Sequence, residues 1–268
     1  MKASATATLP APPATPSQRP CGQGRIEVGW ARHEDEVREA QRLRFDVFAG
    51  ELGARLATPV PGHDIDRFDD YCEHLLVRDA LTGEVVGTYR LLTPAQALRA
   101  GGTYCDNEFD LARLAPLRAR MVELGRSCVH PRYRQGGVIL ALWAALAAFM
   151  GRNGLETMIG CASIPVNDAG AHNLDSGRSA AAGLWHQVRR DHLADPRYHV
   201  QPRIALPVDG PLPVAAVEPP PLIKGYLRLG AKALGPPAWD AAFNTADLPM
   251  MMRMADLPER YRRSANGG

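Results

Sequence analysis

The sequence has no apolar run long enough to cross a membrane. Its longest such run, residues 138–150, falls short of the roughly 20 residues that a spanning helix needs. The N-terminus also lacks the apolar stretch of a secretory signal. The 5 cysteines are scattered and none belongs to a Cys-x-x-Cys pair, so no zinc site or disulfide framework is expected. These absences predict a cytoplasmic protein without a bound metal.

An excess of one charge is missing as well. The chain has 31 Lys and Arg against 29 Asp and Glu, which gives a net charge of +2. This balance gives no reason to expect nucleic acid as a partner, and local patches matter more than the total. The 8 histidines show no partner spacing that would mark one as a nucleophile or ligand. The search for function therefore turns to local motifs.

The chain divides into a short tail and one predicted domain. Residues 1–24 are mostly Ala, Thr, Pro and Ser, so they are predicted to be disordered. Residues 25–263 are predicted to fold as a single domain, because the elements after the Pro-rich stretch 207–221 would make a poor core alone. Hydrophobic periodicity predicts strands near 26–28, 74–78, 85–92, 121–129, 156–162, 200–206 and 248–254, and helices near 33–52, 138–150, 183–193, 222–234 and 256–263, with one or two short helices within 93–118.

The stretch 119–151 is the most informative motif of the sequence. It predicts a strand, a basic turn with two glycines, and an almost wholly apolar helix. The free N–H groups and partial positive charge of a helix N-terminus favour an anion. Such an anion, a phosphate, would be bound by residues of the turn: Arg132, Arg134, Gln135, Gly136 and Gly137. The alternative is a solvated basic turn.

This strand–turn–helix and the order of elements resemble the GNAT acyltransferase fold. The resemblance implies an α/β fold with a mixed, mostly antiparallel central sheet and helices on both faces. In that family the turn before the central helix cradles the pyrophosphate or phosphopantetheine of an acyl thioester. Here the turn matches the family loop loosely, which leaves room for acyl carrier protein as the donor. No permanently bound cofactor is implied.

The N-terminal half resembles acyl-homoserine lactone synthases more narrowly. The segments LRFDVFAGELG at 43–53, HDIDRFDD at 63–70 and GEVVGTYRLLTP at 83–94 carry this resemblance. It implies an active-site cluster of two arginines, a phenylalanine and an acidic trio: Arg44, Phe48, Asp64, Asp66, Asp69 and Arg90. The arginines are natural partners of the aspartates. Alternatively, one or two aspartates receive the ammonium groups of an amino-acid acceptor, the loop is simply solvated, or it binds a metal.

The longest resemblance is to L-ornithine Nα-acyltransferases. It rests on VELGRSCVHPRYR at 122–134, GCAS at 160–163 and PPLIKGYLRLGA at 220–231. Those enzymes make lyso-ornithine lipid from a 3-hydroxyacyl-acyl carrier protein. The resemblance implies that ornithine is favoured over glutamine or lysine as acceptor. A one-chain aminolipid product also allows peripheral contact with the inner face of the membrane.

Amide formation from a thioester needs a group that takes a proton from the amine. Glu123, on the central strand with Arg126, is the candidate general base, directly or through water. The alternative is a structural Glu123–Arg126 ion pair. Cys128 is predicted to be a small buried apolar residue rather than an acyl carrier.

A stripe near the C-terminus combines Lys224, Tyr226 and Arg228. It could pack the acyl chain, dock the carrier protein or contact anionic lipid heads, or it is a solvated helix face. The methionines at 250–252 are predicted to be strand core. The leading function is thus acyl transfer to ornithine. The alternatives are an acyl-homoserine lactone synthase and a non-catalytic carrier-protein or lipid-binding module.

Overall fold

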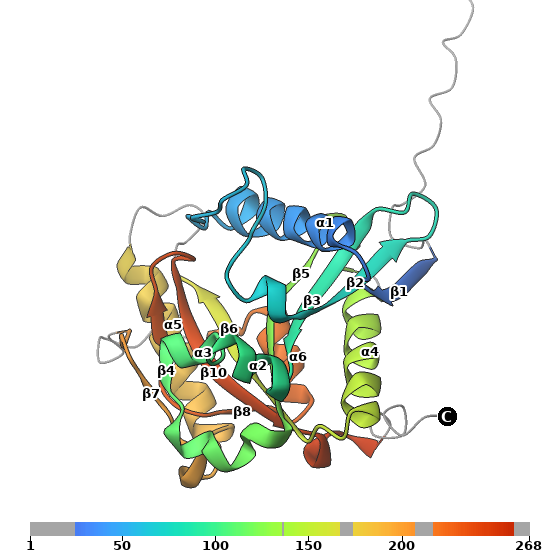
Figure 1. Ribbon diagram of the computed structural model, residues 1–268. Helices are drawn as coiled ribbons and strands as arrows, with labels where there is room; N and C mark the ends of the chain where they lie inside the picture. The colour runs from blue at the N-terminus through green and yellow to red at the C-terminus, as the bar shows by residue number, and fades with distance from the viewer. Residues whose placement is uncertain (1–24, 136, 167–173, 207–216, 260–268) are drawn as a thin grey trace, which may run out of the picture.

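The structure is a computed structural model that describes residues 25–135, 137–166, 174–206 and 217–259 (Figure 1). The predicted tail and Gly136 lie outside these ranges, so the division of the chain at residue 25 stays a prediction.

A mixed sheet of eight strands runs through the described part of the chain. Seven strands follow one another across it in the order β1-β2-β3-β5-β6-β10-β8, and β9 pairs with β10. Their bounds are β1 Ile26–Trp30, β2 Glu73–Asp79, β3 Val85–Leu92, β5 Met121–Val129, β6 Thr157–Pro165, β8 Lys232–Ala233, β9 Ala238–Asp240 and β10 Thr245–Arg253. Among the described strands, β5 and β6 pair in parallel and the other pairs are antiparallel. The predicted mixed, mostly antiparallel α/β fold is confirmed.

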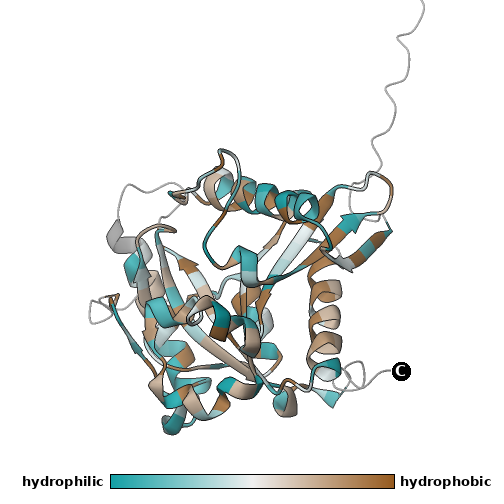
Figure 2. Ribbon diagram, viewed as in Figure 1, coloured by the Kyte–Doolittle hydropathy of each residue, from teal (hydrophilic) through white to brown (hydrophobic). Residues whose placement is uncertain are grey.

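Helices cover both faces of this sheet. The strand β2 shows this, because its successive apolar side chains are buried in two different core clusters. Leu75 and Val77 pack in the same core cluster as α4 (Val138–Arg152), whereas Leu76 packs with α1 (Glu34–Phe45). Successive side chains of a strand point to opposite faces, so α1 and α4 lie on opposite sides (Figure 1). The long apolar face of α4 matches its burial against β2 and β3 (Figure 2). The predicted central strand, turn and helix are confirmed.

The other half of the sheet has its own two layers. On β6 and β10 one face packs against α5 (Leu174–Asp191) and α6 (Pro221–Arg228), and the other against the region of α3 (Cys105–Glu108). The remaining elements are the helix α2 (Pro94–Ala100), the small sheet of β4 (Phe109–Asp110) with β7 (Gln201–Pro202), and short helical segments at Asp46–Glu51, Asp69–Tyr71, Ala112–Arg120, Pro131–Tyr133, Pro196–Tyr198 and Met254–Asp256.

Two predictions for the C-terminal part, a helix and a strand, were wrong in extent. The helix predicted over 222–234 ends at Arg228, because Gly230 takes a φ of 95° that turns the chain into β8. Lys232, which lies within the predicted helix, therefore belongs to a strand. The strand predicted over 200–206 shrinks to two residues, and the sequence pattern did not reveal β9. Of the helix predicted over 256–263, residues 260–263 lie outside the described ranges.

The central strands β5 and β6 separate partway along their length. Their pairing runs from Met121–Thr157 to Glu123–Ile159, although both strands continue well beyond that point. Beyond Glu123, β5 also carries an irregularity in its register with β3, and Arg126 has a left-handed φ of 52°. The separation leaves an opening in the middle of the sheet, with the side chains of two diverging strands along its walls.

Candidate active site

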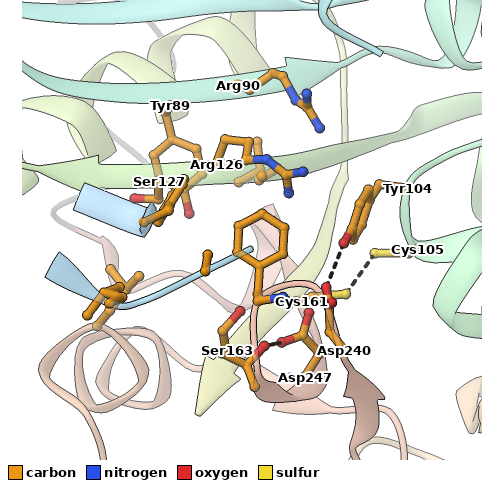
Figure 3. Close-up of a pocket in the computed structure, with 18 of the residues that line it drawn as sticks. Tyr89, Arg90, Tyr104, Cys105, Arg126, Ser127, Cys161, Ser163, Asp240 and Asp247 are labelled. Atoms are coloured by element: carbon orange, nitrogen blue, oxygen red, sulfur yellow. Dashed lines mark hydrogen bonds between the residues drawn. The ribbon is translucent and has the colours of Figure 1, made fainter. Parts of the chain in front are cut away.

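A cavity of about 490 Å³ occupies the opening between β5 and β6 (Figure 3). Its walls come from residues that are far apart in the sequence. They include Phe48 and Glu51 after α1, Tyr89 and Arg90 of β3, Tyr104 and Cys105 of the segment at α3, Glu123 to Ser127 of β5, Cys161 and Ser163 of β6, Tyr226 of α6, and the residues Asp240, Phe243, Thr245 and Asp247 at β9 and β10.

Arg44 is the deepest member of an ion network beside this cavity. Its side chain is fully buried. Nε donates to Oδ2 of Asp64 at 2.8 Å, and the two Nη atoms donate to both carboxylate oxygens of Asp69 at 2.9 and 2.8 Å. A bidentate arginine–carboxylate pair fixes distance and orientation together. Arg44 therefore anchors the acidic loop to α1 rather than facing a substrate.

Two more arginines complete the network at the cavity wall. Arg90 donates to Asp66 at 2.6 Å and to Asp69 at 3.0 Å. Arg126 donates to Asp64 at 3.1 Å and to Asp66 at 3.0 Å. The predicted pairing of the acidic trio with Arg44 and Arg90 is confirmed, and Arg126 joins it. Since each aspartate has two arginine partners, the trio carries no uncompensated charge.

The network keeps the carboxyl groups of Asp66 and Asp69 ionised. Burial alone would raise the pKa of Asp66, but Arg90 and Arg126 outweigh burial and hold that pKa below its usual value. The pKa of Asp69 is lowered in the same way by Arg44 and Arg90. Trio and arginines thus form a rigid, neutral wall, and the wall does not offer a free carboxylate to an ammonium group.

Glu123 lies at the point where β5 and β6 separate, and its side chain reaches the cavity. It is 6% exposed, and its two oxygens accept from the backbone N–H groups of Tyr104 at 2.7 Å and Cys105 at 2.6 Å. Its carboxylate does not pair with Arg126, whose guanidinium binds Asp64 and Asp66, so the alternative of a Glu123–Arg126 ion pair was wrong. Burial raises the pKa of Glu123.

Arg126 is held between aromatic rings as well as carboxylates. Its guanidinium carbon lies 4.9 Å from the ring centroid of Tyr104 and 4.6 Å from that of Phe243. Phe48 packs edge-on against Phe243, with 5.7 Å between centroids, and also lines the cavity. The predicted Phe48 and Arg126 are therefore brought to one side of the site.

Tyr226 turns toward the cavity and not toward the surface. Its hydroxyl group is hydrogen-bonded to that of Tyr89, and burial raises the pKa of both phenols. Lys224 pairs with Glu218 instead, and Arg228 is exposed. The single basic-aromatic stripe predicted from the sequence was therefore wrong. Residues two apart on an α-helix point in nearly opposite directions, so Tyr226 faces inward while Lys224 and Arg228 share the other side.

Two small apolar pockets, of about 40 and 30 Å³, adjoin the cavity at Tyr89, Leu124 and Tyr226. Methionines line them, among them Met158 and Met252. Methionine side chains are flexible and polarizable, so such pockets can adapt to an apolar chain. The predicted burial of the methionines in the strand is confirmed for Met250 and Met251.

The basic turn lies outside the cavity walls. Arg134 donates to both oxygens of Glu51 at 2.5 and 2.6 Å, and Arg132 lies 3.8 Å from a Glu84 oxygen. Gln135 and Gly137 are exposed. Glu51 itself lines the cavity, so the turn adjoins the site through this residue. Phosphate binding by the turn stays a prediction, and Gly136 lies outside the described ranges.

The far wall of the cavity holds two carboxylates that the sequence analysis missed, Asp240 and Asp247. Tyr104 donates its hydroxyl hydrogen to Asp240 at 2.8 Å, and the Thr245 hydroxyl donates to Asp247 at 2.8 Å. The available signal was Asp247 itself, a charged residue within the otherwise apolar run of β10. Asp240 gave no signal, because the three-residue strand β9 has no recognisable period.

The four cysteines that the structure describes show no feature of an acyl carrier. Burial raises the pKa of Cys128 to about 12, which confirms it as a small core residue. Cys105 and Cys161 line the cavity with their sulfur atoms 3.6 Å apart. This contact, followed by burial, raises the pKa of the Cys105 thiol. In Cys161 the contact lowers the thiol pKa, but burial and nearby carboxylates outweigh it and raise that pKa to about 11. In the part of the chain that the structure describes, no cluster of His, Cys, Asp and Glu is arranged to hold a metal ion, and no helix could span a bilayer.

Comparison with known proteins adds to this geometry. A family model described as an Acetyltransferase (GNAT) domain matches residues 43–144. The solved structure of the CoA-dependent acyl-homoserine lactone synthase BjaI, with SAM and isopentyl-CoA, superposes with a TM-score of 0.50. It covers 87% of this chain and 81% of that chain at 17% identity, and shows the fold alone.

Curated relatives are similar over nearly the whole chain. The L-ornithine N(alpha)-acyltransferase of Brucella abortus is 38% identical over 251 residues, which make up 89% of this chain and 88% of that protein. The protein of the same name from Agrobacterium fabrum is 37% identical over 252 residues, 89% of this chain and 84% of its own length. The chain therefore belongs to the L-ornithine N(alpha)-acyltransferase family and is an acyltransferase with the GNAT fold.

Proposed function

We propose that the protein transfers an acyl chain, 3-hydroxylated by resemblance, from acyl carrier protein to the α-amine of ornithine and so makes lyso-ornithine lipid. The observation that carries this proposal is the near-full-length similarity to proteins named L-ornithine N(alpha)-acyltransferase. The cavity supports it, since a buried carboxylate and an apolar extension meet between β5 and β6.

The chemistry is direct aminolysis. The neutral α-amine attacks the thioester carbonyl, the C–N bond forms, the C–S bond breaks, and the pantetheine sulfur leaves with a proton. Glu123 accepts the amine's proton, directly or through water. Its raised pKa brings the carboxylate closer to the pKa of an α-ammonium, which favours proton transfer.

The donor enters from the basic turn. Its phosphate binds at Arg132, Arg134 and the N–H groups that precede α4, and Arg134 leaves Glu51 to do so. The acyl chain extends from Glu123 past Tyr89 and Tyr226 into the methionine-lined pockets, whose side chains rearrange around it. Carrier proteins with acidic surfaces would be attracted by these exposed arginines.

The product has one acyl chain and a charged headgroup. We place the enzyme in the cytoplasm, with peripheral contact at the inner face of the membrane. Arg228, exposed at the end of α6, is the candidate contact to anionic lipid heads.

A mass-spectrometric assay tests the function. Purified protein is incubated with 3-hydroxyacyl-carrier protein or 3-hydroxyacyl-CoA, each with ornithine, lysine, glutamine or S-adenosylmethionine. We expect Nα-acylornithine with the carrier-protein donor. Product with S-adenosylmethionine alone would favour a lactone synthase, and no product with any acceptor would favour a binding module. Preference for the CoA donor would refute the carrier-protein part of the proposal.

A further inference from the structure

Two groups of carboxylates line or flank the cavity, and their charge is balanced very differently. The acidic trio of the network is matched by Arg44, Arg90 and Arg126. Asp240, on the opposite wall, accepts from the Tyr104 hydroxyl and from the backbone N–H groups of two following residues, Ala242 and Phe243. Asp247 accepts from the Thr245 hydroxyl. These partners are neutral, whereas those of the trio are arginines. Within the described ranges, no lysine or arginine forms an ion pair with either of them. The second group therefore carries negative charge that the protein does not neutralise.

This charge is also withdrawn from water. Asp240 is 7% and Asp247 3% exposed, yet both line the cavity. Figure 3 shows them with Ser163, across the cavity from Arg90 and Arg126. A buried carboxylate without a cation pays a large desolvation penalty unless a ligand supplies the missing charge. The opposing arginines do not supply it, because Arg126 already donates to Asp64 and Asp66.

Burial and the unbalanced charge shift the pKa values of the carboxyl groups in this region. Burial, followed by repulsion from Asp240, raises the pKa of Asp247 to about 6, against the opposing effects of Thr245, Ser163 and Arg126. Burial and both aspartates also raise the pKa of the neighbouring Glu108 to about 7. Above a pH of about 6, Asp247 is therefore mostly ionised, and its charge attracts a positive group that enters the cavity.

We propose that Asp240 and Asp247 form the subsite that binds the side-chain ammonium of a dicationic amino-acid acceptor. This inference rests on the proposed function and assigns part of that site. It replaces the acidic trio as the predicted ammonium site, because the arginines occupy the trio.

The side-chain ammonium, and not the α-amine, fits this subsite. A carboxylate pair stabilises a protonated amine, and a protonated amine does not attack a thioester. The side-chain amine, with a pKa near 10.4 in lysine, stays protonated at neutral pH, whereas the less basic α-amine loses its proton more readily. The aspartate pair would hold the side-chain amine in its protonated, unreactive form and leave the α-amine to be deprotonated by Glu123. The same subsite would thus direct acylation to Nα.

The test compares two acceptors of the same carbon skeleton. Ornithine carries the δ-ammonium, and 2-aminopentanoic acid ends in a methyl group at that position. We measure kcat/KM for both with Asp247→Asn, with Asp240→Asn and with Asp70→Asn as a control. Asp70 is exposed, so its variant makes the same change in charge away from the cavity.

For each cavity variant, kcat/KM for ornithine should fall roughly 10- to 100-fold, since hydrogen bonds to charged groups have about this effect. The value for 2-aminopentanoic acid should stay within about 3-fold, and Asp70→Asn should change neither. An equal loss with both acceptors would refute the subsite and indicate a structural or proton-transfer role. Unchanged ornithine kinetics would refute it as well.

A binding titration of ornithine without acyl donor covers the case in which 2-aminopentanoic acid is not a substrate. The dissociation constant should rise by the same factor in the cavity variants, at an unchanged melting temperature. An unchanged constant would overturn the inference. Tighter binding of Mg²⁺ than of ornithine to the wild type, lost in Asp247→Asn, would instead assign the pair to a metal. The wild-type acceptor panel separately decides the proposed function, because its failure would show as absent ornithine turnover before any variant is made.

Discussion

Replacing Arg44 with methionine should destabilise the protein strongly although the side chain touches no substrate. The methionine fills much of the same space but removes every hydrogen bond of the guanidinium. Nε, Nη1 and Nη2 no longer donate to Asp64 and Asp69. Both carboxylates are almost fully buried, at 3% and 5% exposed, so water does not replace the lost partners.

The size of the destabilisation depends on the ion pairs that Asp64 and Asp69 keep in the variant. Breaking a buried ion pair costs about 3–5 kcal/mol when one charge is left uncompensated. Here Asp69 keeps Arg90 and Asp64 keeps Arg126, so the lower end applies. We expect the free energy of unfolding to fall by about 3 kcal/mol. At about 2–4 °C per kcal/mol for a domain of this size, the melting temperature should fall by about 6–12 °C.

Urea unfolding at pH 7 measures the change, and Arg38→Met is the matched control. Arg38 lies on the same helix and forms an exposed pair with Glu34 at 2.8 Å, with side chains 33% and 78% exposed. Arginine and methionine have similar helix propensities, so this contribution cancels. Such surface pairs contribute about 0.3–0.5 kcal/mol. Equal losses in the two variants, within about 1 kcal/mol, would refute the argument that the buried network stabilises the fold.

The pH dependence of the free energy of unfolding is a second test of the same prediction. The pKa of Asp69 is lowered in the folded protein, so its contribution is complete above the unfolded pKa of about 3.9 and is lost as pH falls through the folded value. Arg44→Met removes part of that contribution. The difference in the free energy of unfolding between wild type and variant should therefore be nearly constant from pH 7 to about pH 4 and should narrow as the pH falls below about 3.9. A difference that stays constant at lower pH would contradict this account.

Three further predictions concern the cavity and its approach. Glu123→Gln should lower kcat by about 10²–10⁴-fold, as measured by steady-state kinetics, and an unchanged kcat would exclude Glu123 as the base. The variant should also lose the acidic limb of the pH–rate profile. In the wild type the midpoint of that limb should lie above the ordinary pKa of 4.5, because the base acts only above its raised pKa. Tyr226→Phe should reduce the free energy of unfolding by about 1–3 kcal/mol, since it leaves the buried Tyr89 hydroxyl without this partner; an unchanged urea midpoint would argue against the contact. Arg134→Ala should change the free energy of unfolding by less than about 1 kcal/mol, because its pair is 42% and 35% exposed, yet raise KM for the carrier-protein donor; an unchanged KM would remove Arg134 from the phosphate site.

The sequence predicted the N-terminal and central parts of the fold well, because their patterns are local. The short apolar runs of β2 and β3 on either side of a glycine turn, and the long apolar run of α4, specify those elements almost alone. After residue 200 the elements are two to nine residues long and their course depends on contacts with distant strands. The helix predicted across Gly230 shows the limit. Periodicity continues through that residue, and a single left-handed φ ends the helix.

The candidate site was predictable where a family resemblance named its residues. The resemblance named Arg44, Arg90 and the acidic trio, and their opposite charges predicted that they pair. Nothing in the sequence indicated that Arg126 also binds the trio. The register irregularity and positive φ that direct Arg126 toward the loop are properties of the folded strand. Glu123 lines the cavity, as a general base would, and its catalytic role stays a prediction. Its backbone partners, Tyr104 and Cys105 at the start of α3, have no signature in the sequence.

The distribution of charge across the cavity separates two tasks that the sequence had assigned to one acidic loop. A trio fixed by three buried arginines cannot also receive a substrate ammonium without losing one of its own partners. The wall that binds the acceptor must instead hold charge that is unmatched before the substrate arrives, as Asp240 and Asp247 do. Because the trio is rigid and neutral, it can position Arg126 and the rings around it without competing for the acceptor. Under the proposed assignment, Asp240 and Asp247 bind the side-chain ammonium and Glu123 takes the proton of the α-amine, so the cavity distinguishes two amines of the same molecule.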